Sequence, residues 1–183
     1  MKLKPGAAIL TYAFNGCTNL SKVYNLNTAQ YIGEYAFLSC SALDQTIDLQ
    51  SLSIGNLGRQ AFFGAGARPL HVKLGTLASD TNITNYFDDY NIKYVTIQPN
   101  EHIPDYMFAW CPNLEFVYNL DTACEIGASA FYSCGKLSNS KLLSCSSIGS
   151  YAFMGCSTVA FSNLPAAPVI GEYAFFLPRR RIA

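Results

Sequence analysis

The chain has 183 residues, of which 50% are hydrophobic and 13% charged, and its 12 Lys and Arg balance 12 Asp and Glu. The hydrophobic content excludes a disordered or fibrous protein, and the neutral balance disfavours nucleic acids and acidic membranes as partners. No stretch approaches the ~20 apolar residues of a membrane span, and the first residues lack the apolar segment of a signal peptide, so we expect neither feature.

One phrase, Ile-Gly-x-Tyr-Ala-Phe-x-x-Cys, returns along the whole chain in more or less complete copies. The copies start 20 to 26 residues apart, a period typical of repeat architectures. In chain order they begin at Ile9, Ile32, Leu57, Ile83, Ile103, Ile126, Ile148 and Ile170. Residues 50–92 are irregular, because Gln60, Ala65 and Asp88 stand where Tyr, Cys and Phe are expected. We therefore predict one domain over residues 1–183, a single solenoid of about eight repeats that begins and ends within a repeat, as a truncated array would.

A longer repeat lies above the short one. Residues 17–40 align without a gap on residues 111–134, with fifteen identities in twenty-four positions. The offset is 94 residues (111 minus 17), the length of four repeats. Duplication of a four-repeat block explains this match, and we find no linker that would divide the chain into two domains.

Each repeat contains one short segment with strand character, upstream of its Ile anchor. Residues 20–26, 70–74, 94–97 and 116–120 are rich in β-branched, aromatic and alternating residues. No window has the 10 to 12 residues of helical period that an ordinary helix needs, so we expect a 3₁₀ or single helical turn at Tyr-Ala-Phe. Strands that recur in one direction form a parallel sheet, and a unit this short buries its apolar side only by stacking on its neighbours. The pattern predicts a curved solenoid.

Three rows of apolar residues recur in register: the Ile anchors, a Phe row, and a Leu or Ile row six residues before each anchor. We predict that they form ladders through the core. The Phe row is Phe14, Phe37, Phe62, Phe108, Phe131, Phe153 and Phe175, and the Leu row is Leu3, Leu26, Leu77, Ile97, Leu120, Leu142 and Leu164.

Seven Cys residues invite a disulfide framework, but five of them share one repeat position, three residues after the core Phe. Those five are Cys17, Cys40, Cys111, Cys134 and Cys156. We interpret them as buried free thiols, and Cys124 and Cys145 in the same way, because Cys packs well in cores and an odd total disfavours full pairing. No pair has Cys-x-x-Cys spacing and the two His lie in different parts of the repeat, so we predict no metal site.

Catalytic chemistry finds no support in the residue pattern. No nucleophile, acid and base recur together, and the isolated glycines form no phosphate-binding loop, so we predict no enzyme and no cofactor. Asp88 and Asp89 form the only adjacent carboxylate pair. We interpret them as a solvated bulge, with an exposed aromatic and acidic contact patch or a cation site as alternatives.

The strand position just before the Leu row is polar in the repeats, so we expect it to face solvent on the sheet side. We predict that this face binds a partner, with neighbouring Tyr residues adding contact area if they project the same way. The candidate residues are Asn25, Thr76, Thr96, Asn119, Lys141 and Asn163, with Tyr24, Tyr94 and Tyr118. The Tyr of the repeated phrase, such as Tyr12, Tyr86 or Tyr151, either packs at the edge of the core or anchors a partner.

The pattern Ile-Gly-x-x-Ala-Phe-x-x-Cys-x-x-Leu, plainest over residues 126–137 and 148–159, resembles the BspA-like, or Treponema-type, leucine-rich repeats. The resemblance covers essentially the whole chain. It implies an α/β repeat solenoid, a right-handed leucine-rich-repeat superhelix with one short parallel β-strand per repeat and mostly 3₁₀ or short turns on the other side.

The resemblance also implies a class of function. Repeats of this type belong to surface or secreted proteins that adhere to host matrix or to other cells, so it implies a non-enzymatic adhesin-like module with a protein or glycoprotein ligand on the sheet face. An intracellular scaffold that binds a protein partner through the same face is the alternative. We expect a monomer or weak end-to-end self-association.

Overall fold

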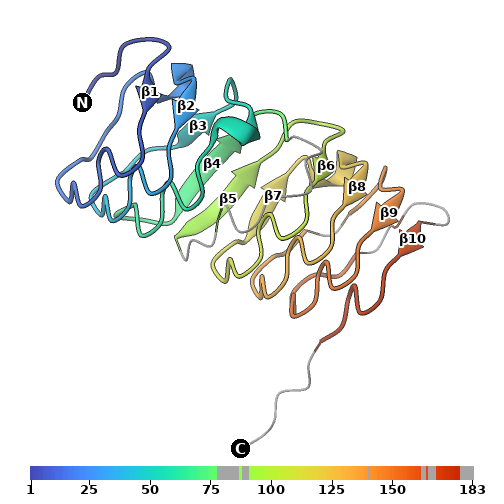
Figure 1. Cartoon of the computed structure of the whole chain (residues 1–183). Coiled ribbons are helices and arrows are strands. Elements are labelled where there is room, and N and C mark those ends of the chain that lie inside the picture. Colours follow the sequence, from blue (N-terminus) through green and yellow to red (C-terminus); the bar gives the residue numbers. More distant parts are fainter. Residues whose placement is uncertain (78–86, 88–90, 140, 162–163, 165–167, 178–183) are drawn as a thin grey trace, which may run out of the picture.

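The computed structural model describes residues 1–77, 87, 91–139, 141–161, 164 and 168–177 (Figure 1). The repeats stack side by side in chain order, from the N-terminal repeat at one end to the last strand at the other. Their buried side chains form one hydrophobic cluster. The described chain is thus a stack of repeats around a continuous core.

The longer strands form one parallel sheet. These strands are β3 (Ile47–Leu49), β4 (Leu70–Leu74), β5 (Ile92–Thr96) and β7 (Phe116–Tyr118), and they pair in that order. Residues alternate between the two faces of a strand, and in β4 Leu70, Val72 and Leu74 are buried whereas His71 and Lys73 are half-buried. The apolar alternation therefore turns one face of the sheet to the core. The predicted solenoid of short parallel strands is confirmed.

A second parallel ladder, which the sequence analysis did not predict, runs along the Ile anchors. Its strands have two residues each: β1 (Ala8–Ile9), β2 (Tyr31–Ile32), β6 (His102–Ile103), β8 (Glu125–Ile126), β9 (Ser147–Ile148) and β10 (Val169–Ile170). β1 pairs with β2, and β6, β8, β9 and β10 pair in that order. Strands of two residues leave no periodicity in the sequence, which is why only one strand per repeat was expected.

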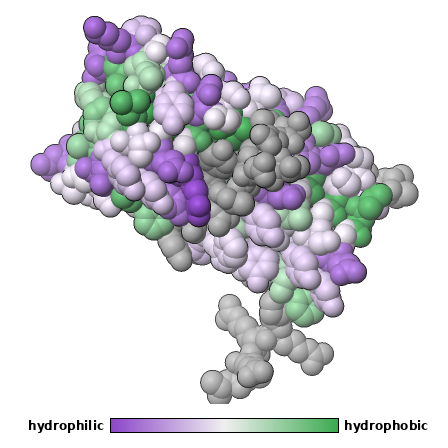
Figure 2. Space-filling model, viewed as in Figure 1, coloured by the Kyte–Doolittle hydropathy of each residue, from purple (hydrophilic) through white to green (hydrophobic). Residues whose placement is uncertain are grey.

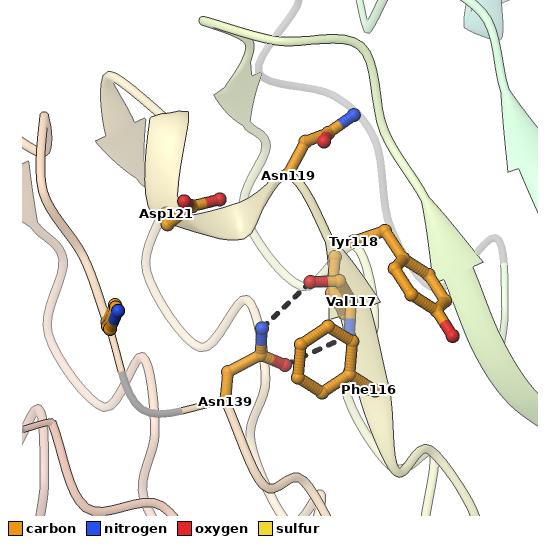
Figure 3. Close-up of a pocket in the computed structure, with 7 residues that line it drawn as sticks. Phe116, Val117, Tyr118, Asn119, Asp121 and Asn139 are labelled. Carbon is orange, nitrogen blue, oxygen red and sulfur yellow. Dashed lines mark hydrogen bonds between the residues drawn. The ribbon is translucent and has the colours of Figure 1, made fainter.

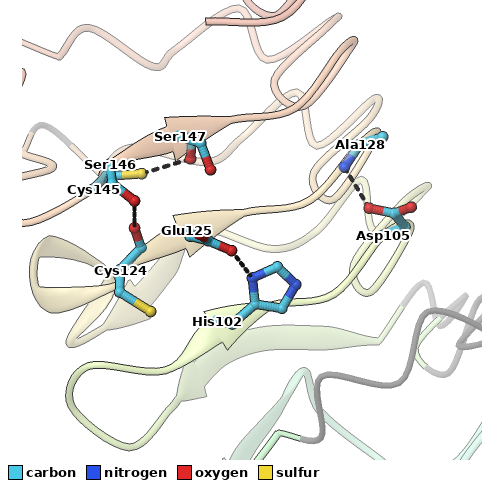
Figure 4. A network of polar contacts seen from close by, with 8 residues as sticks. All are labelled: His102, Asp105, Cys124, Glu125, Ala128, Cys145, Ser146 and Ser147. Carbon is cyan, nitrogen blue, oxygen red and sulfur yellow. Dashed lines mark hydrogen bonds and ion pairs between the residues drawn. The ribbon is translucent and has the colours of Figure 1, made fainter. Parts of the chain in front are cut away.

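Polar side chains link neighbouring repeats beside this second ladder (Figure 4). His102 Nδ1 lies 3.0 Å from a carboxylate oxygen of Glu125, its register partner on the next strand. Asp105 accepts a hydrogen bond from the Ala128 amide at 2.7 Å. These contacts fix one repeat against the next outside the core.

Short helical segments are few in the described residues: three 3₁₀ helices and no α-helix. They are η1 (Leu26–Thr28), η2 (Ile54–Asn56) and η3 (Leu120–Thr122). η1 and η3 begin at the Leu row, directly after Asn25 and Asn119. They do not lie in the Tyr-Ala-Phe segment, where we expected a helical turn. The Leu side chain that begins each of these two helices is buried.

The Tyr-Ala-Phe-x-x-Cys segment instead forms a turn whose alternate amides point at the next repeat. The amides of Ser129, Phe131 and Ser133 donate to carbonyls of that repeat at 2.7 to 2.9 Å. Ser129 and Ser133 take φ values of 53° and 60°, in the left-handed region. A left-handed residue other than glycine costs roughly 1–2 kcal/mol, which the recurring inter-repeat hydrogen bonds offset.

The predicted Phe ladder is present and its rings stack from repeat to repeat. Phe131 lies between Phe108 and Phe153, with ring centroids 5.3 and 5.1 Å away. The irregular fourth repeat also supplies a rung, Phe87, which is buried and stacks on Phe108 at 5.7 Å. The sequence alignment placed Asp88 at this rung. The correction is a shift of one residue, and it follows from the gain of burying a ring instead of a carboxylate.

The Cys row is held by hydrogen bonds to the backbone of the Phe row. Four of its five thiols, all but Cys17, donate to the carbonyl of the core Phe one repeat earlier, as Cys134 does to Phe108 at 3.0 Å and Cys156 to Phe131 at 2.9 Å. Burial raises the pKa of the Cys134 thiol well above its usual value, so it stays protonated. All seven Cys are free thiols. Two of them differ from the predicted buried state: Cys17 is exposed and Cys124 is half-buried.

The 94-residue duplication appears in the structure as duplicated contacts. Asn119 takes φ 68° and donates its side-chain amide to the carbonyl of Ile97 at 2.8 Å. Asn25, its counterpart, takes φ 63° and donates to the carbonyl of Leu3 at 2.9 Å. Conformation and bond recur together, so the two blocks keep the same local design and not only the same residues.

Candidate functional site

Four aromatic rings gather on the solvent side of the parallel sheet. We call His71, Tyr94, Phe116 and Tyr118 the aromatic face. The His71 ring lies 6.1 Å from that of Tyr94 and 5.6 Å from that of Tyr118. Tyr118 also meets Tyr94 at 6.3 Å and Phe116 edge-on at 5.0 Å. The face spans three strands, so it exists only when these repeats are stacked.

The register of the strands builds this face. His71 pairs with Tyr94, and Tyr94 pairs with Phe116. The register shifts by one residue where β4 meets β5, which leaves Lys93 as the extra residue of a β-bulge and turns Tyr94 outward beside His71. The Lys93 ammonium lies 3.2 Å from the Glu115 carboxylate and 5.2 Å from the Tyr94 ring centroid. The bulge therefore sets a cation at the margin of the aromatic face.

His71 is held as a neutral ring within this face. Its Nε2 lies 2.8 Å from the hydroxyl oxygen of Thr96 on the neighbouring strand. Partial burial lowers the pKa of His71, and the nearby charge of Lys73 lowers it further. A neutral imidazole suits a contact surface made of aromatic rings, since no charge has to be desolvated when a partner covers it.

A hollow of about 370 Å³ lies beside β7, next to the aromatic face (Figure 3). Phe116 and Tyr118 form its aromatic wall, and Asp121 and Lys141 bring one charge of each sign to its lining. Its other lining residues are Val117, Asn119 and Asn139. A wall of rings beside charged groups is the arrangement expected of a protein contact surface, with aromatic anchors and a polar rim.

The Asn139 side chain is committed to the fold. Its amide accepts from the backbone N–H of Val117 at 2.9 Å and donates to the carbonyl of Val117 at 2.8 Å, as Figure 3 shows. It thus replaces a neighbouring strand's backbone where the sheet ends at β7. Gln45 does the same for Val23, the corresponding pair of the first block.

The sequence-predicted residues divide into two groups. Tyr94, Tyr118 and Thr96 lie on the solvent side of the sheet, and Lys141 lines the hollow. Asn25 and Asn119 are half-buried in left-handed turns with their amides bound to the preceding repeat, as described above.

Tyr24 and Thr76 lie apart from the aromatic face. Tyr24 is 58% exposed near the N-terminal end of the solenoid, where it bridges to Lys2 of the preceding repeat. Thr76 is exposed beyond the end of β4. Asn163, Asp88, Asp89 and Tyr86 lie outside the described residues.

The strand register also differs from the sequence alignment. Thr96 pairs with Lys73 and Tyr118, not with Thr76 and Asn119. The number of residues between the strand and the Leu row varies, and this variation breaks the alignment: two precede Leu77, none precedes Ile97, and only the left-handed Asn119 precedes Leu120. The polar residues that precede the Leu row in the sequence therefore do not lie side by side as one row of the sheet.

His71 and Phe116 are the binding candidates that the sequence analysis missed. The alternation in Leu70-His71-Val72-Lys73-Leu74 was a usable signal, since it places His71 and Lys73 on the face opposite the three buried side chains. Phe116 gave no such signal, because a Phe at the start of a three-residue strand is equally typical of the core.

Other candidate chemistry is sparse in the described part of the chain. Among those residues, no three His, Cys, Asp or Glu side chains come together as a metal site would require. No described helix has the length and apolar character to cross a membrane. The described members of the Tyr row are exposed apart from the half-buried Tyr35, and some of them stack: Tyr12 and Tyr35 have centroids 5.1 Å apart, and Tyr151 and Tyr173 5.4 Å.

Comparison with known proteins gives one match. A family profile described as "BspA type Leucine rich repeat region" matches residues 6–71 and 81–177, in 6 copies. No curated protein matches the chain, and no solved structure does.

Proposed function

Because the chain belongs to the BspA-type leucine-rich repeat family, we propose that it is a non-enzymatic module that binds a protein partner through the aromatic face. Members of this repeat family typically act as binding modules. The observation that carries the proposal is the position of four rings, His71, Tyr94, Phe116 and Tyr118, outside the core on one solvent-facing sheet surface.

The physics of the aromatic face supports a contact role. The core is already closed beneath it by buried residues such as Val72, Val95 and Val117, so the rings are not needed to fill the interior. Tyr118 is 44% exposed. Tyrosine offers a large, stiff contact area at small entropic cost, and it is enriched at the energetic centre of protein interfaces.

The margin of the face supports recognition of a protein surface. Lys73, Lys93 and Glu115 lie around the rings, and Asp121 and Lys141 line the adjoining hollow. Mixed charge around an aromatic centre favours a partner of mixed charge and gives the complex a defined orientation. We include Thr96, Tyr94, Tyr118 and Lys141 in the proposed binding surface.

Two settings fit such a module. The family resemblance favours a cell-surface or secreted adhesin-like protein that binds host or cell-surface proteins or glycoproteins. The free thiols favour an intracellular scaffold instead, because Cys residues in oxidising compartments tend to be paired and all seven are unpaired here. We propose the adhesin-like role and keep the scaffold as the second candidate.

A pair of tyrosine variants tests the binding surface. Tyr118→Ala removes the ring that contacts the other three members of the face, whereas Tyr31→Ala removes a ring of similar exposure (39% against 44%) from the second ladder. Binding to immobilised matrix proteins and cell-surface glycoproteins is measured for both. We expect Tyr118→Ala to weaken binding about 10-fold or more and Tyr31→Ala to leave it unchanged. Equal loss in both variants, or none in Tyr118→Ala, contradicts the proposed surface.

Protease treatment of intact source cells separates the two settings. The chain is followed with an antibody, with a cytoplasmic protein and a known surface protein as controls. Loss of the chain while the cytoplasmic protein survives supports the adhesin-like role. Survival of the chain while the surface protein is digested supports the scaffold.

A further inference from the structure

Trp110 is a large side chain in a row of small ones on the turn side of the solenoid. The row is the position directly before the Cys row, and every described member takes a left-handed φ, from 57° at Trp110 to 80° at Gly155. Its other described members are Gly16, Ser39, Gly64 and Ser133. Glycine adopts this conformation without steric cost and a bulky residue does not, so the indole costs free energy that glycine would not.

The backbone does not require an indole at this position. The Trp110 amide donates to the carbonyl of Tyr132 in the next repeat at 2.8 Å. Gly16, 94 residues earlier, donates to the carbonyl of Leu38 at the same distance. Trp110 is also 41% exposed, so the core does not hold it in place. A strained, exposed side chain that the fold does not need points to a role in binding.

The rings of Trp110 and Tyr132 meet across two repeats. Their centroids lie 5.5 Å apart, with the planes inclined by 59°. In the first block the two equivalent positions hold Gly16 and Leu38, although the segments that follow Gly16 and Trp110 share fifteen of twenty-four residues. Both members of the contact therefore differ together, and the second block has an aromatic pair that the first lacks.

A polar pair crosses the same two repeats a few residues further along the chain. Lys136 Nζ donates to the side-chain carbonyl of Asn113 at 2.8 Å, and Lys136 is exposed. Asn113 follows Trp110 by three residues, and Lys136 follows Tyr132 by four. In Figure 2 the lower edge of the middle repeats, where these turns lie in Figure 1, is mostly pale, the colour of intermediate hydropathy. The rings thus stand in mixed surroundings and not in a continuous hydrophobic patch.

These features fit a saccharide better than a protein partner. The face of an aromatic ring carries partial negative charge, which attracts the C–H groups on one face of a sugar ring. The hydroxyls of the sugar need hydrogen-bond partners, which an amide and an ammonium supply. A protein contact instead needs a packed centre that surrounding residues shield from water, and the next members of the row, Ser133 and Gly155, are too small to surround the indole.

We infer that Trp110 and Tyr132 form a saccharide-binding site on the turn side of the solenoid, with Asn113 and Lys136 as hydrogen-bond partners of the sugar hydroxyls. The flank toward residues 88–90 lies outside the described residues. The site shares no residue with the aromatic face, so it can act whether or not that face binds a protein.

Trp110 is the only Trp in the chain, so its fluorescence reports on this site alone. The unaltered chain is titrated with oligosaccharides of glucose, galactose, mannose, fucose, N-acetylglucosamine and sialic acid, and at least one should change the fluorescence saturably. Tyr132→Leu, which supplies the Leu38 of the first block, should weaken that affinity about 3- to 10-fold. Tyr106→Ser removes a ring that is 38% exposed in the same repeat, as Ser129 does in the next, and should leave the affinity unchanged.

Calorimetric titration extends the test to Trp110→Gly, since Gly16 and Gly155 show that glycine fits this conformation. Circular dichroism establishes that each variant is folded. Trp110→Gly should lose all measurable binding of the saccharide, whereas Tyr118→Ala on the aromatic face should keep it.

Three results overturn the inference. One is the absence of any fluorescence change across the panel, and another is full affinity in Trp110→Gly or Tyr132→Leu. The third is a glycoprotein that still binds through Trp110 after a glycosidase has removed its glycans, because the ligand is then a protein. Loss of the saccharide in Tyr118→Ala alone also counts against this site, because it assigns the sugar to the aromatic face.

Discussion

The Phe ladder predicts that one substitution has very different costs in the middle and at the end of the solenoid. Phe131 is 0% exposed and stacked on both faces, whereas Phe175 is 37% exposed and stacks on one neighbour of its row, Phe153. Phe131→Ala removes a fully buried ring between two repeats that are held by their own backbone hydrogen bonds. Such a site collapses little, so the cavity adds to the lost transfer free energy.

The magnitudes follow from this difference. A buried Phe replaced by Ala costs about 3–5 kcal/mol, and we expect Phe131→Ala to fall in that range. Burying a Phe side chain is worth roughly 1.5–3 kcal/mol, and Phe175 realises about two thirds of it without enclosing a cavity, so Phe175→Ala should cost about 1–2 kcal/mol. The predicted gap between the two variants is at least about 1 kcal/mol.

Equilibrium urea denaturation, followed by far-ultraviolet circular dichroism, measures both variants against the unaltered chain. The slope of each transition must also be compared, since repeat arrays can unfold from one end and a smaller slope would reveal partial unfolding. Equal losses of stability in Phe131→Ala and Phe175→Ala, or a larger loss at Phe175, would refute the ladder as the source of stability.

Three further predictions concern single positions. Gly149→Ala should destabilise the fold by about 1–3 kcal/mol, because its Cβ would lie 2.5 Å from a backbone nitrogen of the preceding repeat. A Cβ at Gly55 has no atom within 4 Å, so Gly55→Ala should change the free energy of unfolding far less. Urea denaturation compares the two variants. Burial lowers the pKa of His71 in the folded protein, so the unfolded chain binds the extra proton as the pH falls. The free energy of unfolding should therefore fall as the pH drops below about 6.5, more steeply than in His71→Gln. Denaturation at several pH values compares the two chains, and the same pH dependence in both would disprove the prediction. The exposed Cys17 should react quickly with a bulky disulfide reagent, and the buried Cys134 only on unfolding. Peptide mapping after brief labelling measures both, and similar rates in the folded protein would contradict the exposed position of Cys17 and the buried position of Cys134.

Much of the fold was readable because the repeats restate the same pattern. Each Phe of the repeated phrase marks the core, and the alternation in residues 70–74 marks a strand with one buried face. The second ladder was not readable, since a two-residue strand such as β8 has no period of its own. Phe87 was missed for a related reason: the fixed spacing pointed to Asp88, and only the gain from burying a ring shifts the rung by one residue.

The candidate site was readable only in part. Tyr94 and Tyr118 were found because aromatic residues in polar strand positions stand out. Asn119 was predicted to lie beside them on the binding face. Its left-handed conformation and its hydrogen bond to Ile97 depend on contact with the neighbouring repeat, and the sequence alone does not reveal that contact. The cluster of His71 with Tyr118 joins residues two strands apart, and it follows from a bulge at Lys93 that no local pattern announces.

The two duplicated blocks show where the aromatic face arose. Tyr24 and Tyr118 are equivalent residues, but Tyr24 lies beside Lys2 at 58% exposure and contacts no other aromatic ring among the described residues. Tyr118 instead meets rings from three strand positions. The difference lies in their neighbours: Tyr118 has His71, from the irregular region of residues 50–92, and Tyr94, which directly follows that region. Departure from the repeat pattern there coincides with the proposed binding surface.

Site-specific photo-crosslinking tests the central claim most directly. A photoreactive phenylalanine analogue is placed at Tyr118 in one chain and at Tyr31 in another, and each chain is irradiated on or in its source cells. The account predicts a discrete cross-linked protein from position 118 that excess unaltered chain competes away and excess Tyr118→Ala chain does not, with no such product from position 31. Cross-linking to the same protein from position 31, or competition by Tyr118→Ala as strong as by the unaltered chain, would contradict the aromatic face as the binding surface.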